Sequence, residues 1–257
     1  MNTTVLVRVQ ARGGKFLGPD IGYSLITVRN AVTGALLAQG VATGDSGNLG
    51  ASYSAGASFD TVVTFPPAPA TPIVQFLAPD STTASFVATF DLDAPALVEI
   101  SAAAMTNGIP NEHAISTRLW LWPGASLTQE PGLVLTLPGL NVEFITPGPS
   151  DKPSGTSLDV SVWVTMMCGC EISDLPPNSK SGPWEWPQQE FDVQAMLFDT
   201  NGACVANQQL TLAATSIFGG TIANLQPAEY QLVVTALQPV GANTGLASRW
   251  LTLSSSS

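Results

Sequence analysis

Charged side chains are scarce in this sequence of 257 residues. Only 11% of the residues are Asp, Glu, Lys or Arg, where soluble domains average about 25%. Eight Lys and Arg residues stand against 19 Asp and Glu, which gives a net charge of −11. Basic residues are therefore too few for nucleic-acid binding or for attachment to an anionic membrane surface. A surface with so little charge is also less protected against association, which favours subunit contacts.

Long apolar runs and targeting segments are also missing. No run approaches the roughly 20 residues that span a bilayer, and the N-terminus lacks a basic segment followed by an apolar core. The sequence therefore predicts no membrane insertion and no cleaved signal, so we expect a cytoplasmic protein or one released without a classical signal. Three cysteines are too few for a disulfide scaffold, and the odd count leaves one unpaired.

Catalytic motifs are not evident either. The single histidine, His113, and three cysteines leave the usual zinc sites short of ligands. Residues 44–47, Gly-Asp-Ser-Gly, resemble the nucleophile loop of trypsin-like proteases, but that family places its histidine before the serine and His113 comes after. We therefore expect a flexible turn at 44–47 and a loop histidine at 113. No acidic pair stands out, which leaves a carboxylate-dependent hydrolase as a minor alternative.

Turn residues recur at short intervals between alternating or apolar runs, a pattern typical of an all-β fold. We predict two tandem antiparallel β-sandwich domains, at residues 1–138 and 139–257, with an irregular first domain that contains a Pro-rich connector at 65–72. The expected strands of the first domain are residues 4–10, 23–30, 35–41, 73–76, 84–91, 96–104 and 117–122. The second domain is predicted to have seven strands, at residues 141–145, 157–166, 191–199, 203–212, 215–223, 229–237 and 248–253.

A short motif occurs in both halves. Leu92-Asp93-Ala94-Pro95-Ala96-Leu97 and Leu225-Gln226-Pro227-Ala228-Glu229-Tyr230 each place a Leu and a Pro-containing turn before a strand. The motif resembles strand entries in bacterial immunoglobulin-like and fibronectin-like domains, and that resemblance makes Tyr230 a corner tyrosine. The residues Ile26-Thr27-Val28-Arg29-Asn30, followed by Thr33-Gly34, resemble the prealbumin-like or carboxypeptidase-regulatory-like sandwiches. These resemblances imply fold and little about activity.

Sulfur is concentrated in Met166-Met167-Cys168-Gly169-Cys170. Alternation places the run at the end of a core strand, where Cys168 and Cys170 are open to three interpretations. They are a buried thiol pair packed by Met, a local disulfide in a very small ring, or a soft-metal site for Cu(I) or a related ion assisted by Met167 or Met166. Otherwise the sequence implies no cofactor. Cys204 lies at the opposite pole if the strand order is immunoglobulin-like, so we predict that it pairs with neither of the other two.

Tryptophans supply the candidate interface. Trp120 and Trp122 share one face of a strand whose other face carries Leu119 and Leu121, and we expect such a strand to be covered on both faces, by the second domain or by a neighbouring subunit. Trp184 and Trp186 lie between prolines in the loop after the sulfur run, where they act either as interface anchors or as a cap on the sandwich.

The sequence therefore favours a non-enzymatic structural or interaction protein, which assembles as a homo-oligomer or docks a protein partner through sandwich edges and Trp-rich surfaces. The first alternative is a thiol or Cu(I)-binding protein that uses Cys168 and Cys170. The second is the carboxylate-dependent hydrolase.

Overall fold

A computed structural model describes residues 1–19, 23–47, 79, 81–106, 109–176 and 185–255. Apart from short 3-10 turns, the regular elements in these ranges are β-strands, which confirms the all-β prediction. In the described ranges, no helix is both long enough and apolar enough to cross a bilayer. The chain divides into two compact units, Met1–Pro138 (unit 1) and Gly139–Ser257 (unit 2).

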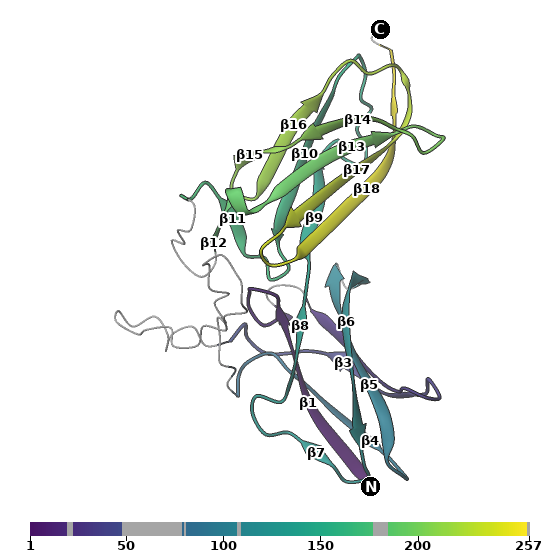
Figure 1. The fold of residues 1–257 in the computed structure, drawn as a ribbon, viewed down its shortest axis with the longest axis vertical. Coiled ribbons are helices and arrows are strands. Elements are labelled where there is room, and N and C mark those ends of the chain that lie inside the picture. Colours follow the sequence, from purple (N-terminus) through teal and green to yellow (C-terminus); the bar gives the residue numbers. More distant parts are fainter. Residues whose placement is uncertain (20–22, 48–78, 80, 107–108, 177–184, 256–257) are drawn as a thin grey trace. The chain divides into compact units, whose positions relative to one another are not determined.

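Unit 1 contains two four-stranded sheets (Figure 1). In the first sheet, β1 (Asn2–Ala11) lies between antiparallel β4 (Phe86–Asp91) and the parallel strands β7 (Ser126–Leu127) and β8 (Leu133–Leu137). The second sheet has the order β3 (Leu36–Val41), β2 (Ser24–Asn30), β5 (Ala96–Thr106) and β6 (Ile109–Leu121). Alternate apolar residues form the core because successive side chains of a strand point to opposite faces: Val5, Val7, Val9, Ile26, Val28, Val98 and Ile100 are fully buried.

Unit 2 has the strand order of an immunoglobulin-like sandwich. One sheet is β9 (Leu140–Thr146), β10 (Leu158–Met166), β16 (Ile217–Ile222) and β15 (Thr211–Ala214), which corresponds to A-B-E-D. The other is β14 (Cys204–Gln209), β13 (Asp192–Phe198), β17 (Ala228–Gln238) and β18 (Asn243–Leu253), in which the last three are C-F-G and β14 is an added edge strand. A short parallel pair, β11 (Glu171–Ser173) and β12 (Glu185–Pro187), lies outside both sheets.

The two units share a sheet pattern. The order β3-β2-β5-β6 matches β14-β13-β17-β18, and β1 and β10 are both central strands. The position beside the central strand is filled by β8 near the end of unit 1, but by β9 at the start of unit 2. The repeated Leu-containing motif precedes β5 in one unit and β17 in the other, so it occupies the same turn of the pattern, with Leu92 and Leu225 buried in both.

Tyr230 forms the predicted tyrosine corner. It lies near the start of β17, is almost fully buried, and donates its hydroxyl to the carbonyl oxygen of Gln226 at 2.9 Å. The bond ties the beginning of the strand to the turn before it. Leu97 occupies the matching place in unit 1, as the sequence indicated, and cannot make this bond.

Several expected strands differ in the structure. The expected strand 203–212 breaks at Leu210, which is buried and donates its N–H to Val193 O, so β14 and β15 belong to different sheets. The expectation of a loop histidine is wrong, because His113 lies within β6. Strands β7, β8, β11 and β12 were not predicted. The expected strand 73–76 and the connector 65–72 lie outside the described residues.

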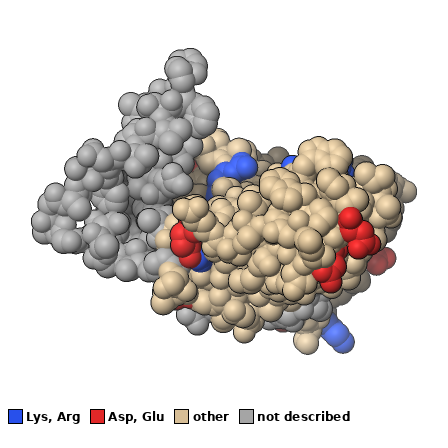
Figure 2. Space-filling model, turned by 90° about the horizontal axis from the view of Figure 1, so that it is seen from below, with Lys and Arg blue, Asp and Glu red and all other residues tan. Residues whose placement is uncertain are grey.

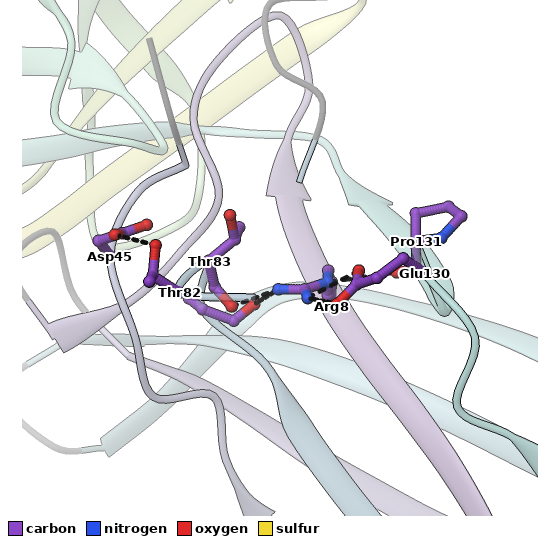
Figure 3. A network of polar contacts seen from close by, with 7 residues as sticks. Arg8, Asp45, Thr82, Thr83, Glu130 and Pro131 are labelled. Carbon is purple, nitrogen blue, oxygen red and sulfur yellow. Dashed lines mark hydrogen bonds and ion pairs between the residues drawn. The ribbon is translucent and has the colours of Figure 1, made fainter. Parts of the chain in front are cut away.

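A buried arginine connects β1 to two loops (Figure 3). Arg8 is 1% exposed and forms a bidentate ion pair with Glu130, at 2.8 and 2.9 Å, while its guanidinium also donates to the carbonyl oxygens of Thr83 and Pro131. Asp45, from the Gly-Asp-Ser-Gly segment, accepts hydrogen bonds from the Thr82 hydroxyl and from the N–H of Gly47. Asp45 therefore holds local loop structure together.

Candidate interaction surface

The sulfur run forms a tight turn at the end of β10. Gly169 donates its N–H to Met166 O at 2.8 Å, and Met166 donates its N–H to Cys170 O at 3.2 Å. Gly169 has a φ of +70°, a left-handed conformation that a residue with a side chain rarely adopts. The chain therefore reverses within three residues and brings the two cysteines side by side.

Cys168 and Cys170 are joined in a disulfide, one of the three sequence interpretations. Both residues are almost completely buried, and so are Met166 and Met167. Soft-metal ligation needs thiolates, and in this state both cysteine sulfurs are already bonded to one another. A Cu(I) site would first require reduction of the disulfide and opening of the packed turn. Across the described residues, no group of three or more His, Cys, Asp and Glu side chains is placed to hold a metal.

Cys204 is a free, exposed cysteine at the start of β14. It pairs with Phe198, the last residue of β13. This end of β13 is remote from the sulfur turn. The opposite end of β13, Asp192, pairs with Leu237. The prediction that Cys204 pairs with neither Cys168 nor Cys170 is confirmed by the disulfide between those two residues.

Trp120 lies near the C-terminal end of β6 and is 65% exposed, and Trp122 directly follows the strand and is 58% exposed. Leu121, between them, is buried and faces the core. The two faces are therefore assigned as expected, and cover of the Trp face by the second domain or by a neighbouring subunit stays a prediction. Within the described residues of unit 1, the Trp face stays open because it is the outer face of the sheet β3-β2-β5-β6, opposite the core.

The outer face of β5 and β6 places charge beside Trp120. Arg118 donates its Nε to Glu99 Oε2 at 2.6 Å, across the two strands. In the next cross-strand pair, Trp120 lies opposite Leu97. We call Trp120, Trp122, Leu97, Glu99 and Arg118 the Trp patch. It combines two large aromatic rings with an arginine, and tryptophan and arginine are both enriched at protein interfaces.

Of the two loop tryptophans, Trp184 lies outside the described residues. Trp186 is in β12, opposite Ile172 of β11, and it is only 8% exposed. It therefore caps the sandwich next to the sulfur turn, and its assignment as an interface residue is corrected. The neighbouring prolines had suggested an open loop, but short parallel pairing with β11 draws the ring inward.

Trp250, in β18, was not among the sequence-predicted interface residues although it is 54% exposed. It lies between two surface pockets whose lining includes Asp151 and Leu251. Its neighbour Arg249 donates to the carbonyl oxygen of Pro147 and stacks over the Phe144 ring at 4.6 Å. The exposure of Trp250 could have been predicted from the sequence, since alternation along β18 places it on the same outward face as Leu246.

Several of the described carboxylates serve local contacts. Asp91 pairs with the N-terminal amine at 3.3 Å, Asp159 accepts the hydroxyl of Thr221, and Asp174 accepts the side-chain amide of Gln188. Asp199 accepts backbone N–H groups in the β13–β14 hairpin. Figure 2 shows one face of the molecule with its charged side chains scattered among uncharged ones.

No protein-family model and no curated protein sequence matches this chain. Similar solved structures include fibronectin(III)-like modules of Clostridium thermocellum CbhA, with 9% identity, coverage of 99% of this chain and 95% of that chain, and a TM-score of 0.29. The titin domains z1z2 in complex with telethonin give 10% identity, coverage of 100% and 97%, and a TM-score of 0.25. Similarity this low carries no functional argument, and the fold assignment rests on the strand order described above.

Proposed function

We propose that this chain is a non-enzymatic interaction protein, which docks a protein partner or another copy of itself through the Trp patch of unit 1. The exposure of Trp120 and Trp122 at the end of an edge strand is the observation that carries the proposal. Tryptophan is enriched among the residues that dominate binding energy, because it offers a large rigid area at a low entropic cost.

The size of the patch indicates what else the interface needs. Covering the exposed parts of two such rings removes roughly 250 Å² of largely apolar surface, a gain of about 6 kcal/mol. Association costs an estimated 4–15 kcal/mol in lost freedom of motion, so the rings alone give weak binding at best. An edge strand next to them supplies the rest, since its unpaired N–H and C=O groups can bond to an added strand.

Photo-crosslinking in the cells that produce the chain tests this proposal. A photoreactive aromatic residue replaces Trp122 in one variant and Trp250 in a matched variant. We expect a defined product from position 122 whose partner peptides are identified by mass spectrometry, and its loss when Trp120→Ser is added. The same diffuse labelling from both positions, unchanged by Trp120→Ser, would contradict a docking role for the patch.

A further inference from the structure

We propose that β6 pairs antiparallel with β6 of a second copy of the chain, around a two-fold axis at Ile115. This inference rests on the proposed function and specifies the partner and the register. Each sheet β3-β2-β5-β6 would then continue into that of the partner subunit, and the contact would be isologous, with the same residues on both sides.

The edge of β6 is available for such pairing. The strand runs from Ile109 to Leu121, and in the described part of the chain β5 is its one ladder partner. Its inward side chains Ile115, Thr117 and Leu119 are only half-buried, whereas the inward residues Val98 and Ile100 of β5 are fully buried. A strand added at this edge would cover the half-buried side chains and satisfy the backbone groups of the edge.

Charge fixes the register. In an antiparallel pair around Ile115, each residue faces the one that lies equally far on the other side of the axis. Glu112 precedes Ile115 by three residues and Arg118 follows it by three. Exposed and half-buried residues alternate from Glu112 to Trp120, which places both charges on the exposed face. Arg118 therefore faces Glu112 of the partner subunit, and the symmetry repeats this pair. An axis at Ala114, Ser116 or Thr117 does not bring these two charges opposite each other.

Arg118 can serve both carboxylates. It uses Nε for Glu99, and its two terminal nitrogens donate to no residue among those described. A guanidinium has five N–H donors arranged in a fork, so it can bond to a second carboxylate without losing the first. The same register places Trp120 opposite the start of β6 in the second copy.

The other edges fit a second copy less well. Strand β18 already packs against β9: a Cβ added at Gly245 would lie 2.4 Å from Leu140 O, and Arg249 reaches over to Pro147. Strands β3 and β14 contain no charged residue that would set a register. Strand β6 shifts its register against β5 between Ala103 and Met105, and its pairing is regular from Ala114 to Leu121.

Sedimentation velocity of the full chain, over a series of concentrations, tests the register through charge reversal. The wild-type chain should dimerise reversibly. Glu112→Lys and Arg118→Glu each place like charges opposite one another twice, and each should weaken dimerisation by roughly tenfold. When the two variants are mixed in equal amounts, every reversed charge faces an opposite one in the mixed pair, so dimerisation should return to within about twofold of the wild-type level.

Rescue by mixing separates the interface from misfolding, because a chain that failed to fold would not be rescued by another variant. Glu99→Gln is the matched control: it removes the ion pair within the chain and leaves the pair between chains, so the dimer should persist. A mixture no tighter than either variant alone, or a wild-type chain that stays monomeric at hundreds of micromolar, would overturn the inference. The crosslink from position 122 to a different protein would still support the proposed function.

Discussion

Arg8 is a fully charged side chain inside unit 1. It lies on the central strand β1, between Val7 and Val9, and the loops that carry Thr83 and Glu130 cover it. Removing a charge from water is costly, and the bidentate pair with Glu130 together with the carbonyl acceptors offsets that cost. Alternation alone predicts an outward, exposed position for this residue, because the loops that cover it are not visible in the local sequence.

Loss of Arg8 should therefore destabilise unit 1. Arg8→Met keeps much of the volume but removes the donor to the loop carbonyls, while the half-exposed Glu130 stays solvated, and we expect a loss of about 1–3 kcal/mol. Arg29→Met, at an exposed position of β2, is the control and should change stability by no more than about 0.5 kcal/mol. Urea unfolding followed by tryptophan fluorescence measures both, and equal small effects would contradict a structural role for the buried network.

At the scale of elements, the sequence predicts strands well where alternation is long. Strands β1, β2, β5, β10, β13 and β17 lie close to their expected ranges. The misses have physical causes: β7 and β11 are too short to show a period, and β8 pairs in parallel with a distant strand. The break at Leu210 could not be predicted from the sequence. A strand that changes sheets keeps its alternation of apolar and polar residues on both sides of the break.

The sulfur turn gives an element-scale prediction about thiol accessibility. With Cys168 and Cys170 joined, the native chain should take up one alkyl group, at exposed Cys204. Unfolding alone should not increase that number, and unfolding with a reductant should raise it to three. Mass spectrometry counts the additions. Three additions on unfolding without reductant would show two free buried thiols and would restore the alternative of a soft-metal site.

The β13–β14 hairpin gives a prediction about pH. The N–H of Ala203, and then that of Asn201, bond to the Asp199 carboxylate and hold its pKa below the ordinary value of 3.8. A lowered pKa in the folded state means that the stabilisation is present above pH 3.8 and is lost as the pH falls through the folded-state pKa. Asp199→Ala should therefore destabilise the chain modestly at pH 7, by an amount that shrinks as the solution is acidified.

The control for this prediction is Asp199→Asn, which keeps a side-chain oxygen as acceptor but does not titrate. Its stability relative to Asp199→Ala should not vary across the acid range. Thermal unfolding from pH 7 to pH 3 measures all three chains, and a difference between wild type and Asp199→Ala that grows in acid would contradict the assignment.

At the scale of the whole molecule, the low charge and the Trp strand favour an interaction protein. Trp120 and Trp122 stay in the candidate site because periodicity placed them on one face and the edge position of β6 leaves that face open. Trp186 is excluded from the candidate site because it is buried. The pairing of β12 with β11 that buries it is not visible in the sequence. Glu112 was not predicted as an interface residue. Its role depends on its distance from Ile115 along β6, and the strand predicted from the sequence begins only at residue 117.

The solvent accessibility of the Trp patch inside the producing cell tests the central claim most directly. Hydroxyl-radical footprinting compares the oxidation rates of Trp120, Trp122 and Trp250 in the cell with those of the dilute purified chain. We predict that Trp120 and Trp122 are oxidised several times more slowly in the cell, relative to Trp250, because a partner covers them. Equal relative rates in the two conditions would show an uncovered patch and would contradict the proposed function.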